Sequence, residues 1–213
     1  MYFEPTVFLV EDDQAMRDSL SQLLEAEGLA VRAFADPKAF LHICPPPRPA
    51  CLILDMRLPG CSGLELQKAL VQQGIDLPFI MISAHGDVLM ATRAMKLGAV
   101  DFIEKPFRGR VLVERVREAL DRDLHSCRQH RHYQNLATRL GQLSPREQEV
   151  LERMVAGKLT KVIAAELGIS VHTAETHRTK VMAKLHAQSL SELVRMWMWF
   201  QQMKRPSSRQ DRS

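Results

Sequence analysis

The chain has 213 residues, 46% of them apolar and 25% charged, a composition typical of a globular protein and unlike that of a disordered one. Its net charge of +4 divides unevenly, because residues 1–121 carry 13 Lys and Arg against 17 Asp and Glu, whereas residues 122–213 carry 16 against 8. Length and asymmetry predict two domains, the second a candidate for binding a polyanion unless its positive charge serves solubility alone.

Several classes of protein are disfavoured by the same inspection. No run of about 18 apolar residues occurs, so we expect no membrane span and no membrane partner. The first residues lack a basic segment followed by a long apolar one, which argues against a signal peptide. The four cysteines show neither C-x-x-C nor a zinc-ligand spacing, so we expect free thiols in a reducing cytoplasm.

Residues 1–121 alternate between short apolar runs and segments with helical spacing. We expect strands at residues 6–10, 30–34, 51–54, 79–82 and 100–104. We expect helices at residues 14–27, from Asp36-Pro37 to the prolines at 45–47, from a Ser62–Glu65 capping box to about residue 73, from Asp87 to Gly98, and at about 110–121. Five strand-then-helix units predict a doubly wound α/β domain with a parallel sheet in the order 2-1-3-4-5.

Residues 122–213 show no strand pattern. Residues 122–142 are polar and are expected to be a linker, with a helical continuation of the preceding helix as one option. Residues 143–203 predict an all-α domain of four helices. These helices start at Ser144-Pro145 with Glu147 completing a capping box, run over 160–167 up to Gly168 and over 171–185 after Ser170, and start again at a Ser189–Glu192 capping box. Residues 204–213 are expected to be a disordered tail.

Acidic, hydroxyl and amine side chains follow the predicted strands of the first domain. Glu11 and Asp12 follow the first strand, Asp55 the third, Ser83 the fourth and Lys105 the fifth. Because the carboxyl ends of parallel strands share one edge, we expect these side chains to converge there. Carboxylates that repel one another favour a bound cation, and a small set of oxygen ligands favours Mg²⁺.

This set of residues suits phosphoryl transfer. Asp55 can attack phosphorus to form an aspartyl phosphate, while Mg²⁺ and Lys105 offset the charge on the phosphoryl oxygens and Ser83 donates a hydrogen bond to one of them. Each residue alone has a plain structural interpretation, such as a turn or a helix cap. An aspartate-dependent phosphatase would need D-x-D on the first strand, whereas Glu11 and Asp12 are adjacent.

Residues 1–121 resemble the receiver domain of two-component response regulators, which has a (βα)5, flavodoxin- or CheY-like fold. The matching residues are Val10-Glu-Asp-Asp13, Leu54-Asp55-x-x-Leu-Pro59 with Gly63, Ser83-Ala84, and Phe102-x-x-Lys105-Pro106. The resemblance implies that Asp55 accepts the phosphoryl group and that Asp12, Asp55 and the backbone carbonyl of Arg57 bind Mg²⁺, with Glu11 acting through water. Asp13 is then the cap of the first helix.

Two switch residues follow from the same resemblance. Ser83 occupies a position where Thr is common, so it keeps the hydroxyl but loses a methyl group. Phe102 matches the switch aromatic and lacks the phenol of Tyr, so any signal relies on burial of the ring. An ordinary core phenylalanine is the other interpretation of Phe102.

The predicted helix 171–185 has two distinct faces. The stripe that we expect to be buried contains Ala174, His177, Val181 and Leu185. We therefore interpret His177 as a structural residue in the first place. The opposite side is small and polar and suits close approach to base edges, and it carries His172, Thr176, Thr179 and Ala183 beside Glu175 and Lys180. With helix 160–167 and the turn at Gly168 it predicts a helix-turn-helix, although any three-helix domain contains such a corner. The cations expected to meet DNA phosphates are Lys161, Arg178, Lys180 and Lys184.

Residues 140–203 look like the LuxR-type DNA-binding domain. The matching residues are Leu143-Ser-Pro-Arg-Glu-x-Glu-Val-Leu151, Ala156-Gly157, Lys161-x-Ile-Ala164, Leu167-x-Ile-Ser170, Thr173-x-Glu175-x-His177-Arg178 and Met182-x-Lys-Leu185. Thr160 and Ala174 depart from the usual Asn and Val. The resemblance adds Thr173 and Glu175 to the expected DNA-binding residues.

The whole chain is similar to NarL/FixJ-type response regulators. The resemblance implies a transcriptional regulator that a sensor histidine kinase phosphorylates, that forms a homodimer when phosphorylated, and that binds double-stranded promoter DNA, with RNA polymerase as a candidate partner. Such a receiver is no enzyme beyond its own phosphorylation and dephosphorylation. The second hypothesis is a receiver that protein partners control instead of phosphorylation. The third is a phosphatase.

Overall fold

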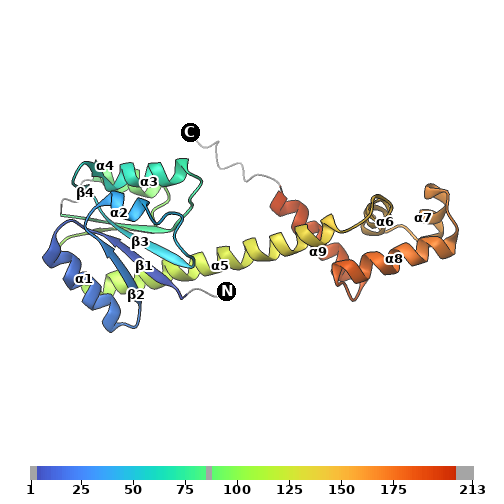
Figure 1. Cartoon of the computed structure of the whole chain (residues 1–213), viewed down its shortest axis with the longest axis horizontal. Helices are drawn as coiled ribbons and strands as arrows, with labels where there is room; N and C mark the ends of the chain where they lie inside the picture. Colours follow the sequence, from blue (N-terminus) through green and yellow to red (C-terminus); the bar gives the residue numbers. More distant parts are fainter. Residues whose placement is uncertain (1–3, 85–87, 205–213) are drawn as a thin grey trace. The chain divides into compact units, whose positions relative to one another are not determined.

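The computed structural model describes residues 4–84 and 88–204, and the chain divides into two compact units, Met1–Arg128 and Gln129–Ser213 (Figure 1). Helix α5 (Gly109–Gly141) belongs to both units, so the residues predicted as a linker are helical as far as residue 141. The predicted helix start at Asp87 and the predicted tail after residue 204 lie outside the described residues. Within the described ranges, no helix combines the length and the apolar character that crossing a membrane requires.

A five-stranded parallel sheet forms the centre of the first unit. Its strands, in spatial order, are β2 (Ala30–Phe34), β1 (Thr6–Val10), β3 (Ala50–Asp55), β6 (Phe79–Ser83) and β7 (Asp101–Glu104). This arrangement confirms the predicted order 2-1-3-4-5 and the doubly wound fold. The central strands β1, β3 and β6 are almost entirely buried, as strands covered on both faces must be.

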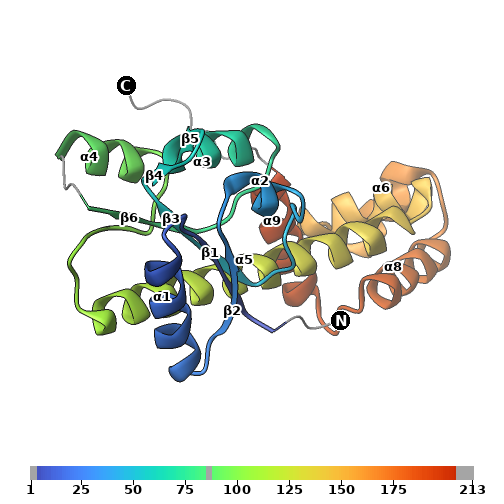
Figure 2. The same cartoon turned by 60° about the vertical axis from the view of Figure 1, so that its left-hand side comes forward.

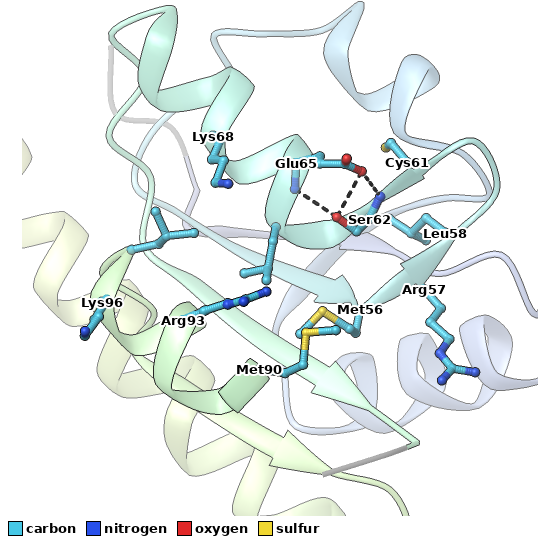
Figure 3. Close-up of a pocket in the computed structure, with 12 residues that line it drawn as sticks. Met56, Arg57, Leu58, Cys61, Ser62, Glu65, Lys68, Met90, Arg93 and Lys96 are labelled. Atoms are coloured by element: carbon cyan, nitrogen blue, oxygen red, sulfur yellow. Dashed lines mark hydrogen bonds between the residues drawn. The ribbon is translucent and has the colours of Figure 1, made fainter. Parts of the chain in front are cut away.

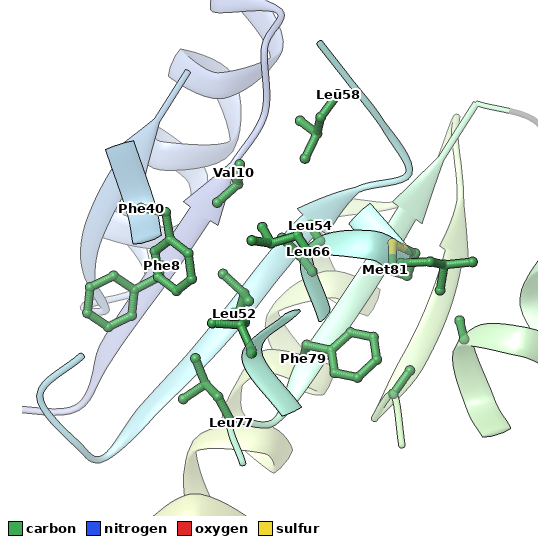
Figure 4. Close-up of a cluster of buried hydrophobic side chains, with 14 of the residues drawn as sticks. Phe8, Val10, Phe40, Leu52, Leu54, Leu58, Leu66, Leu77, Phe79 and Met81 are labelled. Atoms are coloured by element: carbon green, nitrogen blue, oxygen red, sulfur yellow. The ribbon is translucent and has the colours of Figure 1, made fainter. Parts of the chain in front are cut away.

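Helices cover both faces of the sheet (Figure 2). Helices α1 (Gln14–Ala26) and α5 lie on one face, while α2 (Pro37–Leu41), α3 (Gly63–Gln72) and α4 (Val88–Lys96) lie on the other. Alternation along each strand divides the core accordingly: Val7 and Leu9 of β1 pack toward α1 and α5, and Phe8 and Val10 pack toward α2 and α3 (Figure 4).

Four helices complete the second unit with the end of α5, as predicted. They are α6 (Pro145–Val155), α7 (Thr160–Leu167), α8 (Val171–Leu185) and α9 (Leu190–Lys204). Their shared core includes Val150, Ile163, Val181 and Leu193, all buried. The predicted caps are present, since the side chains of Ser144 and Ser170 accept backbone hydrogen bonds at the starts of α6 and α8.

Some local features differ from the predictions. A two-stranded hairpin, β4 (Arg57–Leu58) with β5 (Cys61–Ser62), precedes α3, and the sequence analysis missed it. The expected capping box at Ser189 is only half formed: Ser189 Oγ accepts from Glu192 N, but Glu192 Oε2 accepts from the backbone of Gln188. Helix α2 ends at Leu41, before the prolines that were expected to stop it. Strand β7 starts at Asp101 rather than residue 100.

Candidate functional site

The carboxyl edge of the sheet brings the predicted acidic site together. Asp55 and Ser83 are the last residues of β3 and β6, Glu11 and Asp12 follow β1, and Lys105 follows β7. Register fixes their neighbours, because Asp55 pairs with Ile82 and Ser83 pairs with Glu104 across the parallel ladder. The sheet itself therefore places five chemically active side chains at one edge.

Lys105 joins the two most buried carboxylates. Its Nζ lies 2.7 Å from Glu11 Oε2 and 2.9 Å from Asp55 Oδ1. Glu11 is 3% exposed and Asp55 is 8% exposed, so these contacts form where water screens little. One cation between two carboxylates leaves the group with a net negative charge, to which the exposed Asp12 adds.

The electrostatics of this triad follow from burial. Burial raises the pKa of Glu11, and the nearby charge of Asp55 acts in the same direction, while Lys105 opposes both. Burial by itself would lower the pKa of Lys105, yet its hydrogen bonds to Glu11 and Asp55 outweigh burial and raise it. Lys105 therefore remains protonated at neutral pH and holds the two carboxylates together.

Backbone and guanidinium contacts fix the loops that carry the acids. Arg17 of α1 donates to the backbone carbonyls of Glu11 and Asp12, at 2.8 and 3.1 Å. The backbone N–H of Arg57 donates to Asp55 Oδ2 at 2.8 Å, which orients the carboxylate. Asp13 caps α1 by accepting from Met16 N, as predicted. The part played by Arg17 was missed, since a single arginine on a helix carries no signal in the sequence.

The acidic pocket has the donor set of a hard divalent cation. One carboxylate oxygen from each of Glu11, Asp12 and Asp55 lies within 4.8 Å of the others. All three donors are oxygens from ionisable groups, which is the chemistry that Mg²⁺ prefers. The pocket is therefore compatible with Mg²⁺.

The two predicted switch positions lie on the neighbouring strands β6 and β7. Ser83 is 3% exposed, and its backbone carbonyl accepts from the backbone N–H of Lys105 at 2.7 Å. Phe102 stands opposite Met81 in the β6–β7 ladder and packs, half-buried, against the core beneath α3 and α4. Ser83 and Phe102 thus occupy neighbouring strands of the same edge region.

Helix α8 presents the polar face that the sequence predicts. Ala174, Val181 and Leu185 are buried, and His177 is half-buried on the same side. The opposite residues are exposed: His172, Glu175, Thr176, Thr179, Lys180 and Ala183. Lys161 of α7 is exposed too, and Gly168 makes the sharp turn before α8 in the left-handed region, with φ of 63°. The exposed face of this helix–turn–helix is therefore polar.

Three expected DNA-binding residues lie differently from the rest. Thr173 and Arg178 are half-buried rather than exposed. Lys184 is engaged inside the domain, because its Nζ contacts Glu147 Oε2 at 2.6 Å and the backbone carbonyl of Gln142 at 3.1 Å. Glu147 is 4% exposed, so Lys184 neutralises a buried carboxylate.

Comparison with known proteins covers both units. Residues 7–117 match the family described as "Response regulator receiver domain", and residues 141–197 match "Bacterial regulatory proteins, luxR family". The chain is similar to the transcriptional regulatory protein FixJ of Bradyrhizobium diazoefficiens, with 43% identity over 192 residues that cover 90% of this chain and 94% of that protein. It is 45% identical over 190 residues to nodulation protein W of the same organism, covering 89% and 84%.

Solved structures of similar proteins show the same folds. The response regulator StyR is 38% identical with a TM-score of 0.87, covering 92% of this chain and 99% of that one. Full-length FixJ from B. japonicum is 42% identical with a TM-score of 0.57, covering 92% and 97%.

Proposed function

Since the chain belongs to the response regulators that join a receiver domain to a LuxR-type DNA-binding domain, we propose that a histidine kinase phosphorylates Asp55 and thereby promotes dimerisation and promoter binding. Regulators of this class are phosphorylation-dependent transcription regulators and not enzymes, and a histidine kinase and DNA are their partners. We also infer that the regulator acts in the cytoplasm and that RNA polymerase is a further partner at the promoter.

The observation that carries the proposal is the Lys105 bridge between Asp55 and Glu11. An oxygen of Asp55 attacks phosphorus of a phosphohistidine, a P–O bond forms, and the P–N bond breaks with its electron pair leaving on the imidazole, which ends protonated. Lys105 Nζ lies 2.9 Å from Asp55 Oδ1, which supports a role in neutralising charge on the phosphoryl oxygens, and Ser83 would donate a hydrogen bond to one of them. Glu11, Asp12, Asp55 and the carbonyl of Arg57 would hold Mg²⁺. When bound, the ion neutralises negative charge on the transferred group.

The proposed output runs through the face next to the acidic site. Repositioning of Ser83 and Phe102 changes how α4 packs on β7, and α4 exposes Val88, Leu89 and Met95, at 77%, 66% and 49%. Exposed apolar side chains on one helix favour self-association. Phosphorylation would therefore shift an existing monomer–dimer equilibrium, and the dimer would set two α8 helices on a two-fold DNA site.

The proposed DNA contacts come from α7 and α8. His172, Thr176, Thr179 and Glu175 lie on the exposed face and are placed for base edges or sugar, and Lys161 and Lys180 for phosphates. Thr173 and Arg178 contribute from the margins of that face. Lys184 is left out of the proposed contacts because it neutralises Glu147.

A phosphodonor assay tests the assignment of Asp55. The full chain, incubated with acetyl phosphate and Mg²⁺, should gain the mass of one phosphoryl group on the peptide containing Asp55, and a larger species should appear in size-exclusion chromatography. Asp55→Asn should abolish both changes, and Asp76→Asn, which alters an exposed acid elsewhere, should leave both intact. Equal labelling of wild type and Asp55→Asn would disprove the assignment.

A salt titration tests the DNA surface. Affinity for a duplex should fall as salt rises, because phosphate contacts release counterions. Lys161→Gln should reduce the slope of log K against log salt by about 1, while Lys96→Gln in the receiver should leave it unchanged. Binding that ignores salt would contradict the proposed surface.

A further inference from the structure

The first unit contains a groove between α3 and α4 that is separate from the pocket formed by Glu11, Asp12 and Asp55. Its volume is about 690 Å³, within the range of about 300–1,000 Å³ that is usual for small-molecule sites. Figure 3 shows its lining side chains coming from Met56, the β4–β5 hairpin, the first two turns of α3, and α4.

The floor of the groove is apolar and partly made of sulfur-containing side chains. Met56, Leu58 and Leu64 are buried at 4%, 8% and 9% exposure, and Met90 and Leu97 are half-buried beside them. Methionine side chains adapt to irregular apolar shapes, so such a floor accepts a flat or branched hydrocarbon body.

The rim of the groove is positively charged. Lys68 rises from α3, and Arg93 and Lys96 rise from α4 one turn apart, with the guanidinium of Arg93 reaching toward the space between the helices (Figure 3). None of the three forms a hydrogen bond or close ion pair with another residue of the described chain. Favourable interaction with the dipole of α4 accounts for Arg93 and Lys96 in its last turn, but Lys68 belongs to the middle of α3.

Glu65, the one acid among the described residues of the lining, already accepts hydrogen bonds within α3 and its cap. Glu65 Oε2 accepts from Ser62 N at 2.6 Å and from Ser62 Oγ at 3.0 Å, closing the capping box of α3. These bonds from Ser62, with a smaller contribution from Lys68, lower the pKa of Glu65. Glu65 therefore offsets part of the charge of Lys68, and among the described residues no carboxylate forms an ion pair with Arg93 or Lys96 that an arriving anion would have to break.

We propose that the α3–α4 groove binds a small amphipathic anion, whose apolar body lies on Met56, Leu64 and Met90 and whose carboxylate, sulfonate or phosphate meets Lys68, Arg93 and Lys96. The match of an apolar floor to a hydrocarbon body, and of a positively charged rim to an acidic head, supports a molecule of this class. The volume of about 690 Å³ favours a small molecule over a long peptide helix.

Two dyes of similar shape and different charge test this site on the full chain. 8-Anilinonaphthalene-1-sulfonate carries the acid, and N-phenyl-1-naphthylamine is its uncharged counterpart. Arg93→Gln/Lys96→Gln should weaken binding of the sulfonate about tenfold, and change binding of the uncharged dye by less than about twofold. The control Arg128→Gln/Arg131→Gln removes two exposed cations with the same i,i+3 spacing from α5, and should bind the sulfonate as wild type does.

Methyl resonances locate the bound dye. With ¹³C-methyl methionine, the sulfonate should shift the signals of Met56 and Met90 and leave Met198 and Met203, the exposed methionines of α9, in place. Shifts confined to Met198 and Met203, or equal sulfonate affinity in wild type and Arg93→Gln/Lys96→Gln, would overturn the proposal. So would a sulfonate that fails to bind while an acidic amphipathic peptide shifts Met56 and Met90, because the groove would then be a peptide-docking surface.

Discussion

Replacing Gly63 with alanine should damage the acidic site from beneath. A Cβ at Gly63 would lie 2.5 Å from the backbone oxygen of Asp55 and 3.0 Å from Met81 Sδ, whereas ordinary contacts begin at 3.4 Å. The oxygen belongs to the backbone and has no rotamer by which to avoid the clash, so α3 and the end of β3 must separate by about 1 Å. Overpacking of this kind costs about 1–3 kcal/mol of folding free energy. A displacement of about 1 Å at a reacting group lowers rates by about 100-fold, so labelling of Asp55 by acetyl phosphate should slow accordingly.

The two tryptophans make the assay specific to one unit. Trp197 and Trp199 both lie in α9, so tryptophan fluorescence reports on the second unit, whereas far-UV circular dichroism reports on both. In urea, Gly63→Ala should lower the midpoint seen by circular dichroism and leave the fluorescence midpoint unchanged.

Gly141→Ala is the matched control, because a Cβ there meets nothing within 4 Å. Gly141 ends α5, so the alanine should raise the free energy of unfolding of the second unit by up to about 1 kcal/mol, and the fluorescence midpoint should rise with it. A Gly63→Ala protein as stable and as readily phosphorylated as wild type would refute the reasoning.

Three further predictions follow from individual contacts. Lys105→Met should slow phosphorylation of Asp55 about 100-fold in the acetyl phosphate assay, because it removes the ammonium group that lies 2.9 Å from Asp55 Oδ1. Asp123→Asn should cost about 2–3 kcal/mol by urea unfolding, because buried Asp123 accepts from Arg48 and from Ala50 N at 2.8 Å; an unchanged midpoint would contradict this. The bonds from Lys184 and Ser144 lower the pKa of Glu147 from 4.5, so its contribution to stability is present above pH 4.5 and is lost as the pH falls through the lower folded pKa. Glu147→Gln should therefore flatten the acid limb of the fluorescence-monitored stability curve, and a limb as steep as that of wild type would argue against the pair.

The sheet could be predicted because its signal is repeated. Five apolar runs that alternate with helical segments predict a parallel sheet with helices on both faces, and the observed strand order confirms this topology. The central strands are apolar almost throughout, as buried strands must be. The β4–β5 hairpin escaped because two-residue strands are too short to show a period. Residues 122–142 contain no proline and hold glycine only at 141, so nothing before residue 141 ends a helix. They are also polar, as a linker would be, so the sequence left both a helix and a linker open.

The acidic site could be predicted as a group but not as a set of contacts. Strand ends in a parallel sheet converge, so the sequence indicates which side chains meet. Whether Lys105 contacts Glu11, Asp55 or both depends on distances of a few ångströms, set by loops that Arg17 orients. The pair of Arg48 with Asp123 spans 75 positions, and no local pattern relates the two.

Lys184 shows why helical position alone does not assign a DNA contact. Lys184 is half-buried and lies beside His177 at the margin of the buried stripe of α8, where its Nζ reaches Glu147 at the start of α6. The carboxylate of Glu147 is buried and also accepts a hydrogen bond from Ser144 N. A buried carboxylate without a cation is strongly destabilising, so Lys184 stabilises the domain by pairing with it. Lys184 thus ties the end of α8 to the start of α6. Lys184 should therefore affect DNA binding only through the orientation of α8. Its replacement should change the affinity for every DNA sequence by the same factor.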